Sequence, residues 1–250
     1  MFEFVNLLNY ISIRLVENFW RWCMLNEIFN FEKLFDTFNY VFWFFILNLL
    51  FWIFNIPIIL FFMFIGISRI TTYFPLFLVC LLPTAPIFTV LLYCVNKLYK
   101  NKNISILSDF IRGFKLNFIQ ALVVWIIELI ILFIIYSNIK FFTLIFDSLV
   151  LNGLFIGILI LLGIITPFLF LIISRFSMKN LDVLKLGFTL AFTRPILTIT
   201  NTLLILVFLI LFELNSAILL FVSSIFAFCL VFINRTVFSE LEEISRRNNK

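Results

Sequence analysis

Long uncharged apolar runs alternate with short basic segments along most of this chain. No charged residue occurs between residues 37 and 68, a stretch longer than the roughly 20 apolar residues that a helix needs to cross a bilayer. Similar runs recur and predict six membrane-spanning helices, at residues 38–60, 75–95, 118–136, 151–173, 196–212 and 217–233. The pattern is typical of an all-α, polytopic membrane helix bundle.

Prolines interrupt the first two predicted spans. Pro57 lies near the end of the first span and is expected to kink or end it, because proline cannot donate the hydrogen bond that an inner helical turn requires. Pro83 and Pro86 are expected to break the second span near mid-depth. Thr84 lies between them, and its hydroxyl is a candidate to satisfy the carbonyl groups that the break frees.

Two shorter segments flank the transmembrane domain, which covers residues 37–235. In residues 1–36, apolar side chains recur every three or four positions and face away from Arg14 and Arg21, which predicts an amphipathic helix. Such a helix either lies on the membrane surface or packs against the cytoplasmic end of the bundle. Residues 236–250 are polar and predict a cytoplasmic tail that is helical at first.

Composition supports the membrane assignment, since 64% of the residues are hydrophobic and only 12% are charged. Six spans place both termini on one side of the bilayer. That side then carries sixteen of the 18 Lys and Arg residues, and only Arg69 and Lys140 fall on the other. Loops rich in Lys and Arg stay in the cytoplasm, so both termini are predicted to be cytoplasmic. The positive charge suits anionic lipids, and we expect a lipid bilayer rather than nucleic acid as partner.

The sequence offers little for catalysis or metal binding. It contains no His, the commonest general base and metal ligand. Its four Cys residues are scattered without paired spacing, and it has no glycine-rich nucleotide-binding loop. Asp109, Asp182 and the acidic side chains of the tail are expected to be solvated. We therefore predict no catalytic residue, no cofactor and no metal site, and a protein that is not an enzyme.

A short motif occurs twice on the predicted cytoplasmic side. Residues 113–118 read GFKLNF, and residues 187–192 read GFTLAF. Each copy follows a proline-containing span that enters the cytoplasm and precedes a span that leaves it. Because two spans separate the copies, they share one orientation, as in a parallel repeat.

Both copies have the periodicity of interfacial amphipathic helices. In the first copy the apolar face is Ile106, Phe110, Phe114 and Phe118 and the polar face is Asp109, Arg112 and Lys115; in the second the corresponding faces are Leu181, Leu184, Phe188 and Phe192, and Asp182, Lys185 and Thr189. Such helices either anchor the chain at the membrane surface or form a docking surface for a cytoplasmic or membrane partner.

Residues in and around both copies carry a resemblance to a known family. They are Pro83, Thr84, Tyr93 and Lys97; then Phe110, Phe114, Lys115, Asn117 and Phe118 in the pattern F-x-x-x-[FY]-K-x-N-[FY]; and then Arg175, Phe176, Leu184, Lys185, Ala191, Pro195 and Thr198. Over residues 34–240 the chain resembles the YesL-like family of bacterial integral membrane proteins, which has no established biochemical function. It departs from that family in lacking the glycine that usually follows the basic end of the second span.

The resemblance implies a multi-pass protein of the bacterial plasma membrane. It also implies an accessory role in carbohydrate uptake by an ABC-type transporter, with the permease subunits as partners. Composition and spacing do not show this role, which is nevertheless the leading functional prediction.

One carboxylate lies inside a predicted span. Glu128 falls in the third span, where a charge is costly, so we expect it to face the bundle interior and to be protonated or paired. Asn48 and Asn55, seven residues apart on one helix face, and Asn201 of the fifth span are its candidate neighbours. Two interpretations stay open. One is a neutral Glu that is hydrogen-bonded between helices; the other is a proton- or cation-linked site of a small secondary transporter or channel.

Small residues recur in the fourth predicted span. Gly153 and Gly157 form a G-x-x-x-G pattern in an apolar segment. It predicts close helix packing, either within the chain or between two copies in a homo-oligomer.

Overall fold

The computed structural model describes residues 31–101, 105–145, 149–214 and 219–248, and across these ranges it contains helices and no strand. The predicted N-terminal amphipathic helix falls largely on residues 1–30, outside the described ranges. The chain divides into two compact units, residues 1–43 and 44–250. The first contributes only the beginning of helix α2 to the described residues, so the fold below is that of the second unit.

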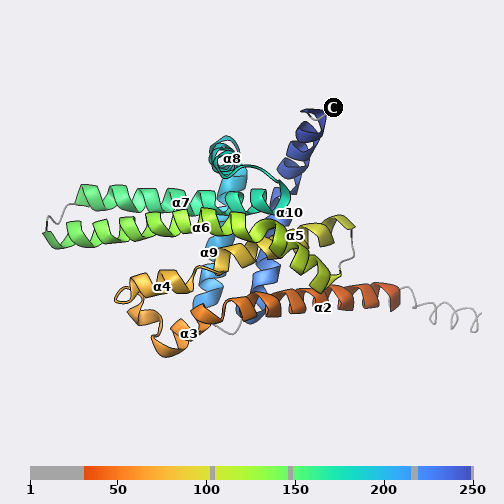
Figure 1. Cartoon of the computed structure of the whole chain (residues 1–250), viewed down its shortest axis with the longest axis horizontal. Coiled ribbons are helices and arrows are strands. Elements are labelled where there is room, and N and C mark those ends of the chain that lie inside the picture. The colour runs from red at the N-terminus through yellow and green to blue at the C-terminus, as the bar shows by residue number, and fades with distance from the viewer. Residues whose placement is uncertain (1–30, 102–104, 146–148, 215–218, 249–250) are drawn as a thin grey trace, which may run out of the picture. The chain divides into compact units, whose positions relative to one another are not determined.

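The helices follow one another with short connections (Figure 1). Their bounds are α2 Phe31–Phe54, α3 Ile56–Phe64, a 3-10 turn Ile67–Arg69, α4 Phe74–Cys80, α5 Thr84–Asn101, α6 Ile106–Ile145, α7 Leu149–Arg175, α8 Asn180–Thr193, α9 Pro195–Leu214 and α10 Leu219–Asn248. The predicted all-α polytopic architecture is confirmed. Four helices are long and apolar enough to cross a membrane, and the number rises to six if each of two bent helix pairs forms one span.

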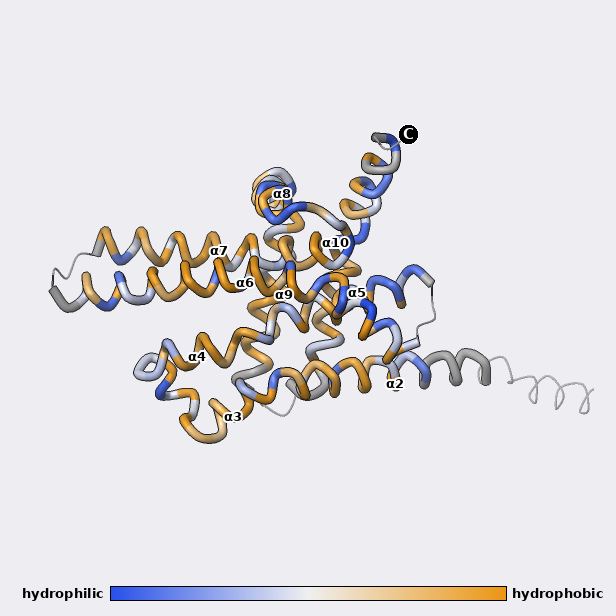
Figure 2. Tube along the Cα trace, in the orientation of Figure 1, coloured by the Kyte–Doolittle hydropathy of each residue, from blue (hydrophilic) through white to orange (hydrophobic). Residues whose placement is uncertain are grey.

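The core of the second unit lies around α5. This helix packs against α6, α7 and α10, and its side chains from Val90 to Leu92, together with Cys94 and Val95, have no exposed surface. Helices α6 and α7 run side by side in opposite directions (Figure 1). Their outer faces stay apolar, as the hydropathy colouring shows (Figure 2), which is the distribution expected of helices that lie in lipid.

The third and fourth predicted spans are each part of a longer helix. The predicted span at residues 118–136 lies within α6, which is continuous over 40 residues. The predicted end of this span at residue 136 is therefore wrong, since the helix continues to Ile145. Asn138 and Thr143 both bond back to the helix through the carbonyl groups of Ile134 and Ile139. The span predicted at residues 151–173 is confirmed within α7.

The first two spans are broken, as their prolines predict. Helices α2 and α3 meet at Asn55 with a bend of 66°, and Pro57 occupies the first turn of α3, where a missing N–H costs little. Helices α4 and α5 are separated by residues 81–83, and Pro86 lies in the first turn of α5. Beyond α3 the chain turns at Gly66, whose φ of +83° favours glycine.

The two motif copies share a packing feature. Gly113 faces α5, and a Cβ atom there would lie 2.7 Å from Cδ1 of Tyr93. Gly187 faces α7 in the same way, where a Cβ atom would collide with the side chain of Leu169. In both copies the glycine lets the lead-in helix lie close against the span before it.

The copies differ after the motif. In the first, α6 continues without interruption from the lead-in into the span. In the second, α8 ends at Thr193 and the chain turns by 99° into α9, which begins at Pro195. Pro195 has no backbone N–H to bond to the preceding turn, which favours a break in the helix there. The predicted fifth span thus corresponds to α9, and the sixth lies within α10, which continues through the predicted tail as far as Asn248.

Replacing Gly113 with Val tests the close approach of α6 to α5. The added side chain must displace the Tyr93 ring or part the helices, and overpacking of this kind costs about 1–3 kcal/mol. We expect a lower thermal unfolding midpoint for the purified protein in detergent. Gly163→Val is the matched control, because a Cβ atom at Gly163 meets nothing within 4 Å. Equal midpoints for the two variants would contradict the packing role of Gly113.

Candidate functional site

Charged side chains from four helices meet at one end of the second unit, which we call the charged end: Lys97 and Lys100 of α5, Asp109 of α6, Arg175 of α7 and Glu242 of α10. Figure 2 shows hydrophilic residues gathered at the end of α5, before α8 and along the last part of α10. Arg69 and Lys140 lie apart from these residues, and Lys140 reaches the carbonyl group of Thr71 instead. The predicted topology assigns the charged end to the cytoplasmic side, and this orientation stays a prediction.

Asp109 is buried, with only 3% of its surface exposed, so the prediction of a solvated Asp109 is wrong. Its Oδ1 atom forms an ion pair with Lys97. Its Oδ2 atom accepts hydrogen bonds from the backbone N–H of Ser105 at 3.0 Å and from the Ser105 hydroxyl at 3.3 Å. A carboxylate in the first turn of α6 also interacts favourably with the positive end of the helix dipole. Asp109 therefore fixes where α6 starts and ties that start to α5.

Arg175 joins α7 to α5 and α10. Its Nε and Nη2 atoms donate to Oδ1 of Asn96 at 2.8 and 2.6 Å, and its guanidinium lies 4.9 Å from the ring centre of Phe238. Its Nη1 atom is 3.9 Å from Oε1 of Glu242, which also accepts from Lys100 at 2.6 Å. Buried polar groups that are fully paired hold their helices in a single arrangement, and this cluster fixes the last part of α10 to the bundle.

Glu240 is paired as well, with Nη2 of Arg194 at 2.8 Å. Glu240 and Asp182 are nevertheless exposed, as expected for solvated carboxylates. The expectation is wrong for Glu242, whose side chain is only 24% exposed and pairs with Lys100 and Arg175. Sequence reasoning missed Asn96, Phe238 and the role of Glu242. One signal was available: Phe238 and Glu242 are four residues apart, so they share a helix face, and both reach Arg175.

Four further basic residues of this end have no acidic partner among the described residues. Arg112 and Lys115 on α6 and Lys179 and Lys185 on the α8 side are exposed, and in the described part of the chain none of them forms an ion pair. We call them the basic face. Gln120 connects its two halves, since its Nε2 atom donates to the carbonyl group of Met178 at 2.7 Å and to Asn180 at 3.1 Å.

Apolar side chains border the basic face. On α6 they are Leu107, Ile111 and Leu116, which are 64%, 55% and 61% exposed, and on α8 they are Leu181, Phe188 and Phe192. Of the apolar face predicted on α8, Leu181, Phe188 and Phe192 are exposed and Leu184 is partly buried, while Val183, Gly187, Leu190 and Ala191 form the buried face of the helix. Cationic and apolar groups side by side are suited to lipid headgroups and to a protein partner alike.

The aromatic stripe of the first copy faces inward instead. Phe110 is buried and, like Phe114, packs against the ring of Phe54 on α2. Phe114 also stacks on Phe118, with ring centres 4.2 Å apart. Asn117 is buried beside them, and its Nδ2 atom has no partner among the described residues. These aromatic positions therefore support packing, and among the predicted residues Phe110, Phe114, Lys115, Asn117 and Phe118 only Lys115 is exposed.

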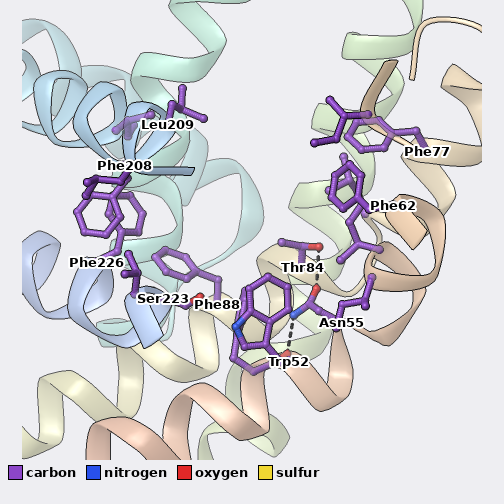
Figure 3. A pocket seen from close by; sticks show the side chains of 18 of the residues that line it. Trp52, Asn55, Phe62, Phe77, Thr84, Phe88, Phe208, Leu209, Ser223 and Phe226 are labelled. Atoms are coloured by element: carbon purple, nitrogen blue, oxygen red, sulfur yellow. Dashed lines mark hydrogen bonds between the residues drawn. The ribbon is translucent and has the colours of Figure 1, made fainter. Parts of the chain in front are cut away.

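Hydrogen bonds join the two broken spans at their breaks (Figure 3). The Thr84 hydroxyl donates to Oδ1 of Asn55 at 2.8 Å, and Nδ2 of Asn55 donates to the carbonyl group of Phe51 at 2.8 Å. The carbonyl group of Leu81, at the break before α5, accepts from the backbone N–H of Thr84 at 3.0 Å and from the indole N–H of Trp125 at 2.9 Å. The Thr84 hydroxyl, which was expected to bond a freed carbonyl group, donates to Asn55 instead.

Glu128 is buried, with 3% of its surface exposed. Its partner is Thr166 of α7, whose hydroxyl lies 3.4 Å from Oε1 and also donates to the carbonyl group of Leu162. Oε2 has no hydrogen-bond partner within the described residues. The interior position is confirmed, and the carboxyl group has one weak contact and one unpaired oxygen in a low-dielectric setting.

The predicted neighbours of Glu128 have other partners. Asn55 pairs with Thr84, Asn48 accepts from the backbone N–H of Ser224 at 3.2 Å, and Asn201 and Asn234 exchange two hydrogen bonds at 3.2 and 2.9 Å. These bonds join helices that are distant in the sequence. Asn48, Asn55 and Asn201 therefore act as buried connections between helices, and the structure does not bring them together with Glu128.

The G-x-x-x-G pattern on α7 has no close neighbour. Cβ atoms built on Gly153 and Gly157 meet nothing within 4 Å. Close packing inside the chain, one of the two interpretations of this pattern, is not seen against the described residues. Packing between two copies stays a prediction. The described residues also contain no group of three or more His, Cys, Asp or Glu side chains that could hold a metal ion.

Fold and site together define a helical, multi-pass membrane protein with a cross-linked charged end and an unpaired basic face. Residues 44–139 match the model of a family described as "Protein of unknown function, DUF624". The matched residues cover less than half of the chain and include Asn55, Thr84, Lys97, Asp109 and Glu128. Comparisons with curated proteins and with solved structures gave no match.

Removing Lys97 tests the buried ion pair. Lys97→Met leaves the Asp109 carboxylate buried without its cation, which we expect to cost about 2–3 kcal/mol of unfolding free energy. Adding Asp109→Asn removes the charge but keeps a side chain that can accept from Ser105, so the double variant should recover at least half of the loss. The measurement is the thermal unfolding midpoint in detergent.

Lys100→Met is the control for this pair. Its ion pair with Glu242 is half exposed on the Lys side, so its loss should cost at most about 1 kcal/mol. The assignment of Asp109 as a buried anchor fails if the double variant is less stable than Lys97→Met.

Proposed function

We propose that this chain is a non-catalytic accessory subunit of an ABC-type carbohydrate uptake system in the bacterial plasma membrane. In this proposal the charged end is cytoplasmic, and the basic face contacts the permease subunits of the transporter. The resemblance to the YesL-like family supports the choice of transport system. The basic face is the surface proposed to contact the permease subunits, and it is the observation that carries the proposal.

Preorganisation supports a docking role for this surface. The ion pairs and hydrogen bonds of Lys97, Asp109, Arg175 and Glu242 fix the helices that present the basic face. A partner that binds a fixed surface loses less conformational entropy than one that orders a loose segment. In contrast, Arg112, Lys115, Lys179 and Lys185 add nothing to the internal ion pairs of the described residues, so their charge is free for an external partner.

The chemistry of the surface also indicates the kind of partner. Exposed Leu107, Ile111 and Leu116 lie on the same helix as Arg112 and Lys115. Arg and bulky apolar side chains are enriched in protein interfaces, whereas scattered Lys alone suits a solvated surface. A partner segment with apolar side chains and one or two carboxylates is complementary to this pattern.

Copurification from the native membrane tests the docking role. Wild-type protein should retain ABC permease subunits, and Lys115→Glu should lower their recovery about tenfold, because a reversed charge repels an acidic partner surface. Lys140→Glu is the matched control, since it makes the same change at the other end of the same helix and should leave recovery unchanged. Equal recovery with both variants would contradict docking through the basic face.

A second candidate function rests on Glu128. Its unpaired Oε2 atom is a carboxylate oxygen buried between α6 and α7, and such oxygens often bind protons or small cations in membrane transporters. This observation favours a small secondary transporter or channel that acts without a partner. The rival explanation is a neutral carboxyl group that only bridges helices through Thr166.

Liposome flux measurements separate these functions. If Glu128 serves transport, purified wild-type protein should carry protons or monovalent cations, and Glu128→Gln should lower the flux at least tenfold with an unchanged unfolding midpoint. Thr166→Val, which removes only the hydroxyl contact, should have a smaller effect. Flux by the wild-type protein alone would contradict the accessory function, and absence of flux would contradict the transporter.

A further inference from the structure

A large apolar cavity lies where the two broken spans meet α9 and α10 (Figure 3). Its volume is about 990 Å³, at the upper end of the range of small-molecule sites. Aromatic side chains from several helices line it, including Phe62 of α3, Phe77 of α4, Phe88 of α5, Phe208 of α9 and Phe226 of α10. We propose that this cavity is a binding site for an acyl chain of a membrane phospholipid.

The cavity is a consequence of the two breaks. At Asn55 the first span bends by 66°, so α3 diverges from the course of α2, and the interruption at residues 81–83 separates α4 from α5 in the same region. Thr84 and Asn55 join the two breaks at the edge of the cavity. Space that straight, neighbouring helices would fill with side chains is left open between them.

The lining favours hydrocarbon over a polar ligand. Two of its polar side chains already have partners within the chain. Oδ1 of Asn55 accepts from the Thr84 hydroxyl, and Nδ2 of Asn55 donates to the carbonyl group of Phe51. A sugar or another polyhydroxylated molecule would lose its hydrogen bonds to water and gain few in return. A methylene chain needs no such partner and gains from leaving a polar environment or filling an apolar void.

The cavity between the described residues is large and apolar, which favours an external apolar occupant. Apolar cavities do not hold ordered water. The cavity is also accessible from the side, since its lining includes Met63, Ile67 and Leu209, which are 74%, 59% and 56% exposed. In a membrane-spanning unit, the molecules next to these side chains are lipids.

A cationic group next to the cavity indicates that the occupant carries an anionic headgroup. Ile67 lines the cavity, and the exposed Arg69 belongs to the same 3-10 turn, Ile67–Arg69. Arg69 forms no ion pair with the described residues. A phosphate at Arg69 would place its acyl chain beside the opening at Ile67. This site lies away from the charged end and is independent of the proposed function.

Native mass spectrometry of the full-length protein, extracted in mild detergent and mixed with phosphatidylglycerol, tests the site. Wild-type protein should retain one phospholipid per chain after detergent washing that removes loosely associated lipid. Leu209→Trp and Ser223→Phe fill the cavity from α9 and α10, and each should lower retention at least tenfold. Leu203→Trp is the matched control, because Leu203 is on the same helix and equally exposed but does not line the cavity.

Two results would overturn the site: wild-type protein without retained phospholipid, or equal loss in Leu203→Trp and Leu209→Trp. Using two filling variants on different helices guards against one that fails to fold, and monodisperse elution confirms folding. The headgroup is tested separately by competition between phosphatidylglycerol and phosphatidylcholine. Arg69→Gln should abolish a preference for phosphatidylglycerol, and Lys100→Gln, which removes a cation already paired with Glu242 at the charged end, should preserve it; a preference that survives Arg69→Gln contradicts the contact with Arg69.

Discussion

Satisfying backbone polar groups inside an apolar medium is the constraint on which this structure depends. Both of the first two spans break, and each break would leave donors and acceptors without partners where no water is at hand. The side chain of Asn55 donates to the carbonyl group of Phe51, and the Trp125 indole donates to the carbonyl group of Leu81, so side chains meet that need at both breaks. The hydrogen bond from Thr84 to Asn55 then joins the two breaks. Once the breaks are joined, the positions of α3 and α4 follow, and with them the shape of the apolar cavity.

The charged end obeys a related rule with ions in place of amides. The buried Asp109 carboxylate is stabilised by its ion pair with Lys97 and its hydrogen bond from Ser105. The mostly buried Arg175 guanidinium is stabilised by its contacts with Asn96, Phe238 and Glu242. Removing a single member leaves a buried charge uncompensated, which is why such groups hold the ends of four helices in one arrangement. The basic face differs in that its cations stay in contact with the surroundings.

Apolar run length and proline position carry most of the fold, so the helical class, the two broken spans and the interior location of Glu128 follow from the sequence. Pairings between distant helices do not, because many polar residues of comparable depth compete for each partner. Thr166 rather than Asn48 or Asn55 therefore reaches Glu128. The continuation of the helix past Ser137 was also not predictable, because polar residues there are typical of a loop. In the structure, Asn138 and Thr143 instead donate hydrogen bonds to carbonyl groups of the same helix. Asp109 was misread because a charge near a helix start is solvated more often than buried.

The unbroken course of α6 has a geometric consequence. At about 1.5 Å per residue its 40 residues extend roughly 60 Å, about twice the hydrocarbon thickness of a bilayer. Tilting the helix accommodates only part of that difference, so part of the helix extends beyond the hydrocarbon layer. Each residue along it turns the surface by about 100°. The direction in which Arg112 and Lys115 point is therefore fixed relative to the lipid-facing surface of the span. One residue inserted between these two side chains and the span would rotate that direction by more than a quarter turn.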